Sequence, residues 1–218
     1  MKRPAIYLLI LAAGIVTCLA PPAEAQGNWQ PGDFGSLRFR MGLAEPRADS
    51  TYWDEVFTTF TGSPSDFRDL SFGLDYLWRT SMHSGLLFGT GFYGGSATQA
   101  YRDYVDADGY DIPHTTSLDT WDLSIAYHYR FGRRQSKVKP YIGLGGGLLN
   151  WRLQESGYFI DFGDPSWPVV WADYRASGWT WQAIGLAGLD FPMSFRWSVF
   201  AEGRYRYSDA ELGQDFSG

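Results

Sequence analysis

Nine ionisable residues stand at alternate positions in stretches whose intervening residues are mostly apolar or aromatic. They are Arg38, Arg40, Asp75, Asp122, His128, Arg130, Glu202, Arg204 and Arg206. Successive side chains of an extended strand point to opposite faces, so this spacing gathers the charges on one face of several strands. An unpaired buried charge is costly, and acids and bases on facing strands must therefore pair. The set predicts a polar interior held by ion pairs.

Such an interior can be a structural filling, or it can form a gated polar pathway. We predict the structural filling and keep the gated pathway as the alternative. We also predict that Glu202 pairs with at least one of Arg38, Arg40 and Arg204, because these residues lie at middle depth in their strands.

A second acidic group occupies a polar segment and comprises Asp103, Asp106, Asp108 and Asp111. The run from Asp106 to Gly109 resembles the start of a calcium-binding loop. The distal bidentate glutamate of that motif is missing, so we predict a solvated turn and no metal site.

The residues closest to a hydrolytic site are His83, Ser84, His114 and His128. His83 and Ser84 are neighbours in a short turn, where they cannot face each other as base and nucleophile. No other Ser-His or Asp-His pair converges by spacing. We therefore predict no catalytic residues, no cofactor and no enzyme.

The stretch from Leu118 to Phe131 shows most clearly which elements position the charges. From Trp121 onward its apolar residues fall on one face, and Asp122, His128 and Arg130 fall on the other. An apolar face that ends in three successive aromatic residues is typical of a strand whose outer face meets lipid. The sequence therefore predicts a membrane β-barrel with a polar interior.

Six further stretches alternate in the same way, at 36–43, 70–78, 86–93, 141–151, 179–190 and 197–207. In the fifth stretch of the seven, Gly143, Gly145 and Gly147 share the inner face and leave room for large side chains. In the sixth, we place Ala183, Gly185 and Ala187 inward and Ile184 and Leu186 outward. The fold class predicted is all-β, an antiparallel up-and-down transmembrane barrel with seven visible strands.

The connections between these strands alternate strictly between long and short. The long ones are 45–68, 96–117 and 152–177, and the short ones are 80–84, 132–139 and 192–196. Outer-membrane barrels have short periplasmic turns and long extracellular loops, which fixes the orientation. Predicted aromatic girdles are Trp78, Tyr129, Phe131 and Trp197 at the inner rim, and Phe92, Trp121, Tyr205 and Tyr207 at the outer rim. Aromatic residues in the long loops suit either a partner or packing among themselves.

The first 25 residues are predicted to be a cleaved export signal, with cleavage before Gln26. Lys2 and Arg3 precede an apolar run that ends before the small-residue site at Ala23 to Ala25. The only cysteine, Cys18, lies in this run, and its surroundings are a poor lipoprotein site because Thr17 replaces a small residue. The net charge of −6 makes nucleic acid an unsuitable partner.

The run from Lys139 to Gly147 resembles the glycine-rich strand of small outer-membrane β-barrels of the OmpA and opacity-protein type. The last two stretches, to Tyr207, are similar to the same family. The resemblance implies eight antiparallel strands, whereas seven are visible. We therefore expect residues 26–218 to be a C-terminally incomplete barrel that lacks about 10 to 20 residues, which would form a closing strand. A gap or strained closure is expected between the first and seventh strands.

Together these features predict a non-enzymatic, structural protein of the Gram-negative outer membrane that presents extracellular loops for interaction. Its expected partners are outer-membrane lipid and an extracellular ligand. The alternatives are a small channel or carrier for small or apolar molecules and an outer-membrane lipid-modifying enzyme.

Overall fold

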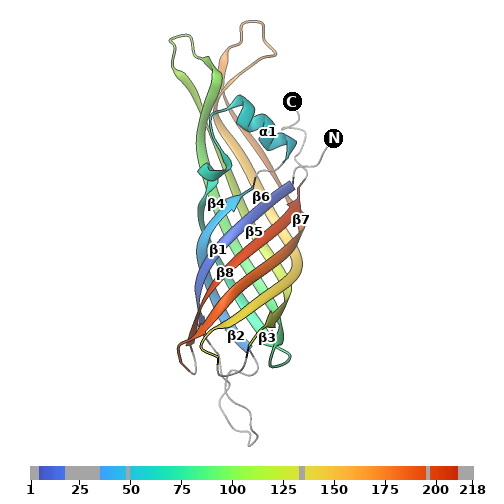
Figure 1. The fold of residues 1–218 in the computed structure, drawn as a ribbon. Coiled ribbons are helices and arrows are strands. Elements are labelled where there is room, and N and C mark those ends of the chain that lie inside the picture. The colour runs from blue at the N-terminus through green and yellow to red at the C-terminus, as the bar shows by residue number, and fades with distance from the viewer. Residues whose placement is uncertain (1–4, 18–34, 48–49, 133–135, 195–196, 211–218) are drawn as a thin grey trace, which may run out of the picture.

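The computed structural model describes residues 5–17, 35–47, 50–132, 136–194 and 197–210. Its eight antiparallel strands follow one another around a closed barrel in chain order (Figure 1). They are β1 (Ala5–Thr17), β2 (Gly35–Pro46), β3 (Asp69–Arg79), β4 (Ser84–Val105), β5 (Asp111–Arg130), β6 (Lys139–Ile160), β7 (Val169–Pro192) and β8 (Trp197–Asp209). The predicted fold class is confirmed, and β2 to β8 are the seven predicted strands.

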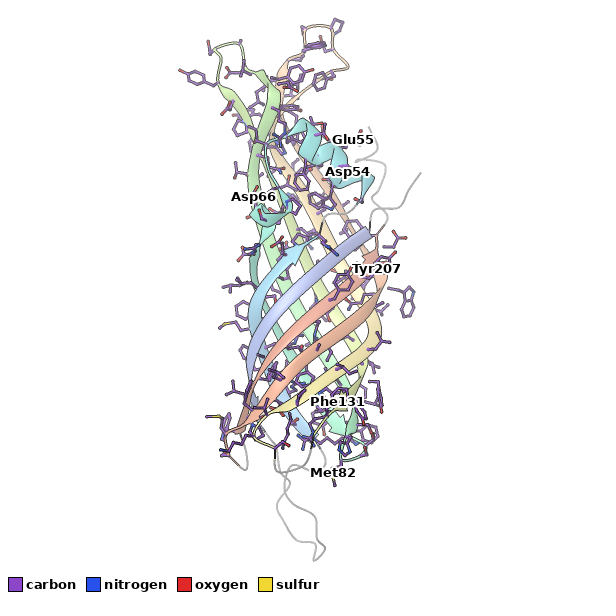
Figure 2. The ribbon with its side chains drawn as sticks, viewed as in Figure 1. Asp54, Glu55, Asp66, Met82, Phe131 and Tyr207 are labelled. Atoms are coloured by element: carbon purple, nitrogen blue, oxygen red, sulfur yellow. The ribbon has the colours of Figure 1, made fainter. Side chains whose placement is uncertain are left out.

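A belt of apolar and aromatic side chains surrounds the barrel, because alternate residues of each strand face outward. Six of the seven strands have the inward and outward faces that were predicted. The exposed members of the belt include Phe39, Met41, Leu43, Phe72, Leu74, Tyr76, Trp78, Phe88, Phe92, Trp121, Leu123, Ile125, Tyr127, Ile142, Leu144, Trp181, Val199 and Tyr205. The predicted girdle residues are all exposed as well. Phe131 and Tyr207, from opposite girdles, lie near opposite ends of the belt (Figure 2). A face of this kind is suited to hydrocarbon rather than water.

The predicted gap separates β2 from β8, and β1 occupies it. Among the described strands, β2 and β8 each pair with β1 and not with each other. Ala12, for example, lies opposite Gly42 on one side and Glu202 on the other. β1 runs from the long-loop end to the short-turn end, the direction that an antiparallel strand between β2 and β8 must take. The residues of β1 are those predicted to belong to the export signal.

Most residues of the three predicted long loops belong to helices or strands. The first contains α1 (Thr51–Thr59) and the 3-10 helix η1 (Pro64–Phe67). The other two are extensions of the hairpins β4–β5 and β6–β7, with turns only at 106–110 and 161–168 (Figure 1). Above the belt the outward residues become polar, which removes the apolar alternation although the strands continue. In the described part of the chain, no helix is both long and apolar enough to span a membrane.

The predicted register of β7 was wrong by one residue. Ile184 and Leu186 are 1% and 5% exposed and face the interior, whereas Ala183 and Ala187 face outward. Leu186 joins a buried apolar cluster with Leu77, Leu87, Ala126 and Tyr141. Outside, the small residues of β7 lie opposite the large Tyr205 and Tyr207 of β8. Apolar residues therefore occur on both faces, and hydrophobicity alone does not choose between them.

Glycine is required at the contact of β5 and β6. A Cβ added to Gly147 would lie 1.9 Å from the Leu123 carbonyl oxygen and 2.8 Å from the Ser124 Cα. We expect Gly147→Ala to destabilise the barrel by about 1–3 kcal/mol, since backbone atoms must move to admit the methyl group. Gly185→Ala is the matched control because nothing lies within 4 Å of its added Cβ. Urea unfolding in vesicles should separate the two, and equal losses would contradict this packing.

Candidate functional site: the barrel interior

The middle of the interior holds a chain of polar contacts around Glu202. Arg204 Nη2 lies 2.9 Å from Glu202 Oε1, and Arg38 Nη2 lies 3.9 Å from Glu202 Oε2. The Tyr141 hydroxyl accepts a 2.7 Å hydrogen bond from Arg38 and donates a 3.0 Å bond to Glu202. The Arg38 guanidinium carbon also lies 4.1 Å from the Phe200 ring centre. Glu202 is thus next to two of the three predicted arginines.

Asp75 joins the third arginine to this chain. Its Oδ2 accepts hydrogen bonds from Arg40 Nε at 2.9 Å and from Arg204 Nη2 at 3.0 Å. The Asp75 side chain is fully buried, as is almost all of Arg40 and Arg204. One carboxylate therefore compensates two guanidinium groups, one from the neighbouring strand β2 and one from β8.

A third group lies towards the loop end. Arg206 Nη2 and Asp122 Oδ1 are 2.7 Å apart, an ion-pair distance, although their orientation forms no directed hydrogen bond. Gly91 makes room for them, since a Cβ there would approach Asp122 Oδ1 at 2.5 Å and Arg206 Nη2 at 2.8 Å. The same atom would lie 3.3 Å from Arg40 Nη2, so this pair borders the Asp75 group.

Seven of the nine predicted residues are thus brought together, and two are not. His128 packs its ring on Tyr141, with ring centres 4.7 Å apart. Arg130 lies at the short-turn rim, where its Nη2 donates to the Met82 carbonyl oxygen at 2.9 Å. Tyr141 is a member of the site that was not predicted from the sequence. Its position two residues before Gly143, on the same face, was the available signal.

Above the ion pairs, α1 and η1 close the loop end of the interior with an apolar layer. Its buried members are Ala44, Trp53, Val56, Phe67, Tyr93, Ala97, Leu118, Trp151, Leu153 and Ala210. Trp53 stacks on Phe57 at 5.5 Å and meets Phe67 edge-on at 5.2 Å. The Ser50 hydroxyl caps α1 by accepting from the Trp53 N–H. Figure 2 shows Asp54 and Glu55 of this helix and Asp66 of η1 at the loop end.

One polar contact ties α1 to the wall. The Tyr52 hydroxyl donates a 2.6 Å hydrogen bond to Glu155 Oε1. Glu155 lies above the belt, where the outward neighbours on β6 are Arg152 and Gln154. Burial raises the pKa of the Glu155 carboxyl, and the hydrogen bonds from Tyr52 and Thr116 oppose this in part. Burial likewise raises the pKa of the Tyr52 phenol.

The raised Glu155 pKa makes α1 docking depend on pH. The docked state holds the proton more tightly than the undocked state, so docking is strongest below the ordinary carboxyl pKa of 4.5. It weakens as pH rises from that value through the raised pKa, and then levels off. Hydrogen exchange of the α1 amides across this range, expressed as protection relative to the intrinsic exchange rate at each pH, should show less protection at higher pH. Glu155→Gln should abolish the trend, whereas Glu55→Gln on the exposed side of α1 should retain it.

The tips of the two long hairpins carry three exposed aromatic rings, which we name the tip cluster: Tyr104, Phe162 and Trp167. They lie beside Tyr101, which is buried. Tyr104 lies 5.4 Å from Phe162 and 6.2 Å from Trp167, measured between ring centres. Phe162 and Trp167 are 50% and 54% exposed. Trp167 has a φ of 46°, a conformation that a bulky residue adopts only where its surroundings impose it. The rings pack on one another and still present a broad apolar surface.

The acidic turn is organised by its own aspartate. Asp106 Oδ1 accepts from the backbone N–H groups of Asp108 and Tyr110 at 2.9 and 2.8 Å, and Gly109 has a φ of 85°. Within the described ranges, no group of three or more His, Cys, Asp or Glu residues is arranged to hold a metal ion.

The ring of His83 and the hydroxyl of Ser84 have different partners. The Ser84 hydroxyl contacts Ser81, whereas His83 Nε2 lies 3.3 Å from the Gly132 carbonyl oxygen. His114 is buried between Phe60 and Phe159, and burial lowers its pKa to about 4. None of these contacts places a base against a nucleophile.

Solved structures with a loose likeness to this barrel are those of an attachment invasion locus protein and of a hydrocarbon channel. Ail, the attachment invasion locus protein of Yersinia pestis, is 11% identical, with 95% of this chain and 99% of that chain covered and a TM-score of 0.30. Ail in complex with the heparin analogue sucrose octasulfate gives 8% identity over the same shares and a TM-score of 0.25. CymD, a monoaromatic hydrocarbon channel, is 8% identical over 98% of this chain and 90% of that chain, with a TM-score of 0.22.

No protein-family model matches the sequence, and no curated protein does. Because the likeness to the solved structures is loose, the function has to be inferred from the geometry of the barrel itself.

Proposed function

We propose that this protein is a non-enzymatic structural barrel of the bacterial outer membrane whose hairpin tips bind an extracellular partner. The observation that carries the proposal is the filling of the interior. Ion pairs centred on Asp75 and Glu202 occupy its middle, and the apolar layer under α1 occupies the loop end. A lumen filled at two successive levels supports a scaffold rather than a pore.

Conductance distinguishes the scaffold from a channel. Purified protein reconstituted into planar bilayers should give no stepwise current, because buried side chains fill the interior at both levels. A matched sample of a general porin supplies the positive control. Reproducible unitary steps from the parent protein would contradict the sealed lumen and favour the gated pathway through the arginines.

The outer-membrane location is supported by the belt and by the predicted export signal. We expect N-terminal sequencing of protein purified from that membrane to begin at Gln26. Removal of β1 would leave the edges of β2 and β8 unpaired in hydrocarbon, which is costly. Another strand with the direction of β1 would then have to pair with both edges. A membrane-extracted chain that keeps residues 5–17 would instead assign β1 to the mature wall.

The tip cluster and its acidic surroundings support the binding of an external partner. Exposed aromatic rings supply large contact areas at interfaces. The turns beside them contribute Asp106, Asp108, Asp161 and Asp164, so the tips are acidic. Ail binds a sulfated heparin analogue. The charge here favours a neutral or cationic partner instead, and we expect immobilised heparin not to retain the folded protein.

A lipid-modifying enzyme is the remaining alternative. Overexpression of such an enzyme would change the mass profile of lipid A, whereas a scaffold leaves it unchanged.

A further inference from the structure

The turns of the two long hairpins are the outermost described part of the loop end, above α1 (Figure 1). They bring the tip cluster together from both hairpins, since Tyr104 belongs to β4 whereas Phe162 and Trp167 belong to the turn between β6 and β7. The Phe162 and Trp167 rings meet edge-on, with their centres 5.7 Å apart. About half of each of these two side chains stays exposed, so the cluster is a packed surface rather than a closed core.

The same hairpins carry further exposed aromatic side chains. Tyr110 ends the β4–β5 turn, and Trp171 packs edge-on against Tyr158 with ring centres 5.3 Å apart. These rings lie above the belt, where the surface meets water rather than lipid. Large apolar surfaces exposed to water are rare in proteins and mark interaction sites.

The charge of the hairpin ends limits the class of partner. Residues 101–111 and 158–171 contain six acids and one base. The acids are Asp103, Asp106, Asp108, Asp111, Asp161 and Asp164. The base is Arg102, whose Nε donates to the Phe57 carbonyl oxygen of α1 at 3.2 Å. Six negative charges and one positive charge leave a net charge of −5 on the segments that carry the rings.

A partner that covers the rings also covers part of these carboxylates. A neutral partner, such as an uncharged glycan, would remove the carboxylates from water without compensating their charge, which is costly. A cationic partner compensates them, and its charges also bind the faces of aromatic rings. Arginine suits both groups, because its planar guanidinium stacks on aromatic rings and binds carboxylates through paired N–H groups.

We infer that the tip cluster binds an arginine-rich segment of an extracellular protein. This inference rests on the proposed function of the hairpin tips and names the chemistry of their partner. The rings supply the apolar contact area, and the aspartates of the same turns supply the opposite charge.

A labelled nona-arginine peptide is the probe, and the full protein folded in an uncharged detergent is the receptor. Fluorescence anisotropy should show saturable binding of this peptide. Nona-lysine should bind about threefold more weakly, because its compact, strongly hydrated ammonium groups do not stack on the rings. A neutral dextran should not compete with nona-arginine.

Asp161→Asn/Asp164→Asn should weaken nona-arginine binding about tenfold, since two charges are lost from the turn that carries Phe162 and Trp167. The turn should fold, because asparagine oxygens can still accept from the Gly163 and Ser166 N–H groups, now 2.9 and 2.8 Å from the aspartate oxygens. The matched control, Asp54→Asn/Glu55→Gln, removes the same charge from the exposed side of α1. It should change the affinity by less than about twofold.

Trp167→Gly should weaken nona-arginine binding about fivefold, the effect of losing one exposed contact between a cation and an aromatic ring. Glycine adopts the φ of 46° at this position without strain, so this variant should also fold. Trp167→Tyr keeps an aromatic ring and should retain most of the affinity.

Equal losses in the tip and α1 charge variants would show attraction by the net charge of the whole protein and would overturn the inference. So would equal binding of the two peptides, or an unchanged affinity in Trp167→Gly. Binding of dextran in place of nona-arginine, lost in Trp167→Gly, would overturn the cationic partner and leave the tips as a binding site. Conductance of the same preparation tests the sealed scaffold separately, so a wrong partner and a wrong scaffold give different results.

Discussion

Asp75→Ala is expected to destabilise the barrel by about 3–5 kcal/mol, because it leaves the buried Arg40 guanidinium without its carboxylate and Arg204 with Glu202 alone. Arg40 and Arg204 both hydrogen-bond to Asp75 Oδ2, and none of the three side chains reaches solvent appreciably. Urea unfolding of the vesicle-inserted protein, followed by tryptophan fluorescence, measures the loss. This loss of unfolding free energy measures the cost of burying charges that lack a partner. It is not the net contribution of the ion pairs to stability.

Two comparisons test that interpretation. Removing acid and base together, in Asp75→Ala/Arg40→Met, should cost less than Asp75→Ala alone. Asp173→Ala removes an exposed pair with Arg175, 2.7 Å apart, and should change stability by less than about 1 kcal/mol. If Asp75→Ala is as stable as the parent, the interior is hydrated and the sealed lumen is wrong.

Trp53→Ala is expected to weaken the docking of α1 by about 3–5 kcal/mol, the usual cost of removing a buried tryptophan from a packed cluster. Trp53 is 3% exposed and lies between Phe57 and Phe67. The barrel wall below does not depend on it, so the effect should be local. Hydrogen exchange at the Phe60 amide, which is bonded to the Val56 carbonyl, reports the opening of the helix.

Glu55→Ala on the exposed side of α1 is the control and should leave exchange almost unchanged. Faster exchange throughout β2 to β8 in Trp53→Ala would show that the apolar layer supports the whole barrel instead. Unchanged exchange at Phe60 would show that α1 does not close the loop end in solution.

The sequence correctly predicted which residues face inward and which face outward wherever the outer face of the strand is apolar. Alternation placed Arg38, Asp75, Asp122 and Glu202 inward because their neighbours must face hydrocarbon. It failed in β7, where Ile184 joins an apolar interior and the outward positions are small. It also failed above the belt, where outward residues become polar and the strands cannot be told from loops.

The partners within the interior could not be predicted in the same way. Alternation gives the face of a residue but not what it meets across the barrel, and Arg38 and Tyr141 are 103 positions apart. Tyr52 and Glu155 were missed because both fall in predicted loops. The strand role of Ala5–Thr17 had no signal, since its apolar run does not alternate and instead has the features of an export signal.

A heat-modifiability gel on protein extracted from the outer membrane tests the central claim most directly. A closed, hydrogen-bonded barrel resists detergent at low temperature, so the unboiled sample should migrate differently from the boiled one. The boiled sample should run as an unfolded chain of its expected mass. Identical migration of the two samples, from membranes that contain the protein, would contradict a membrane-spanning barrel.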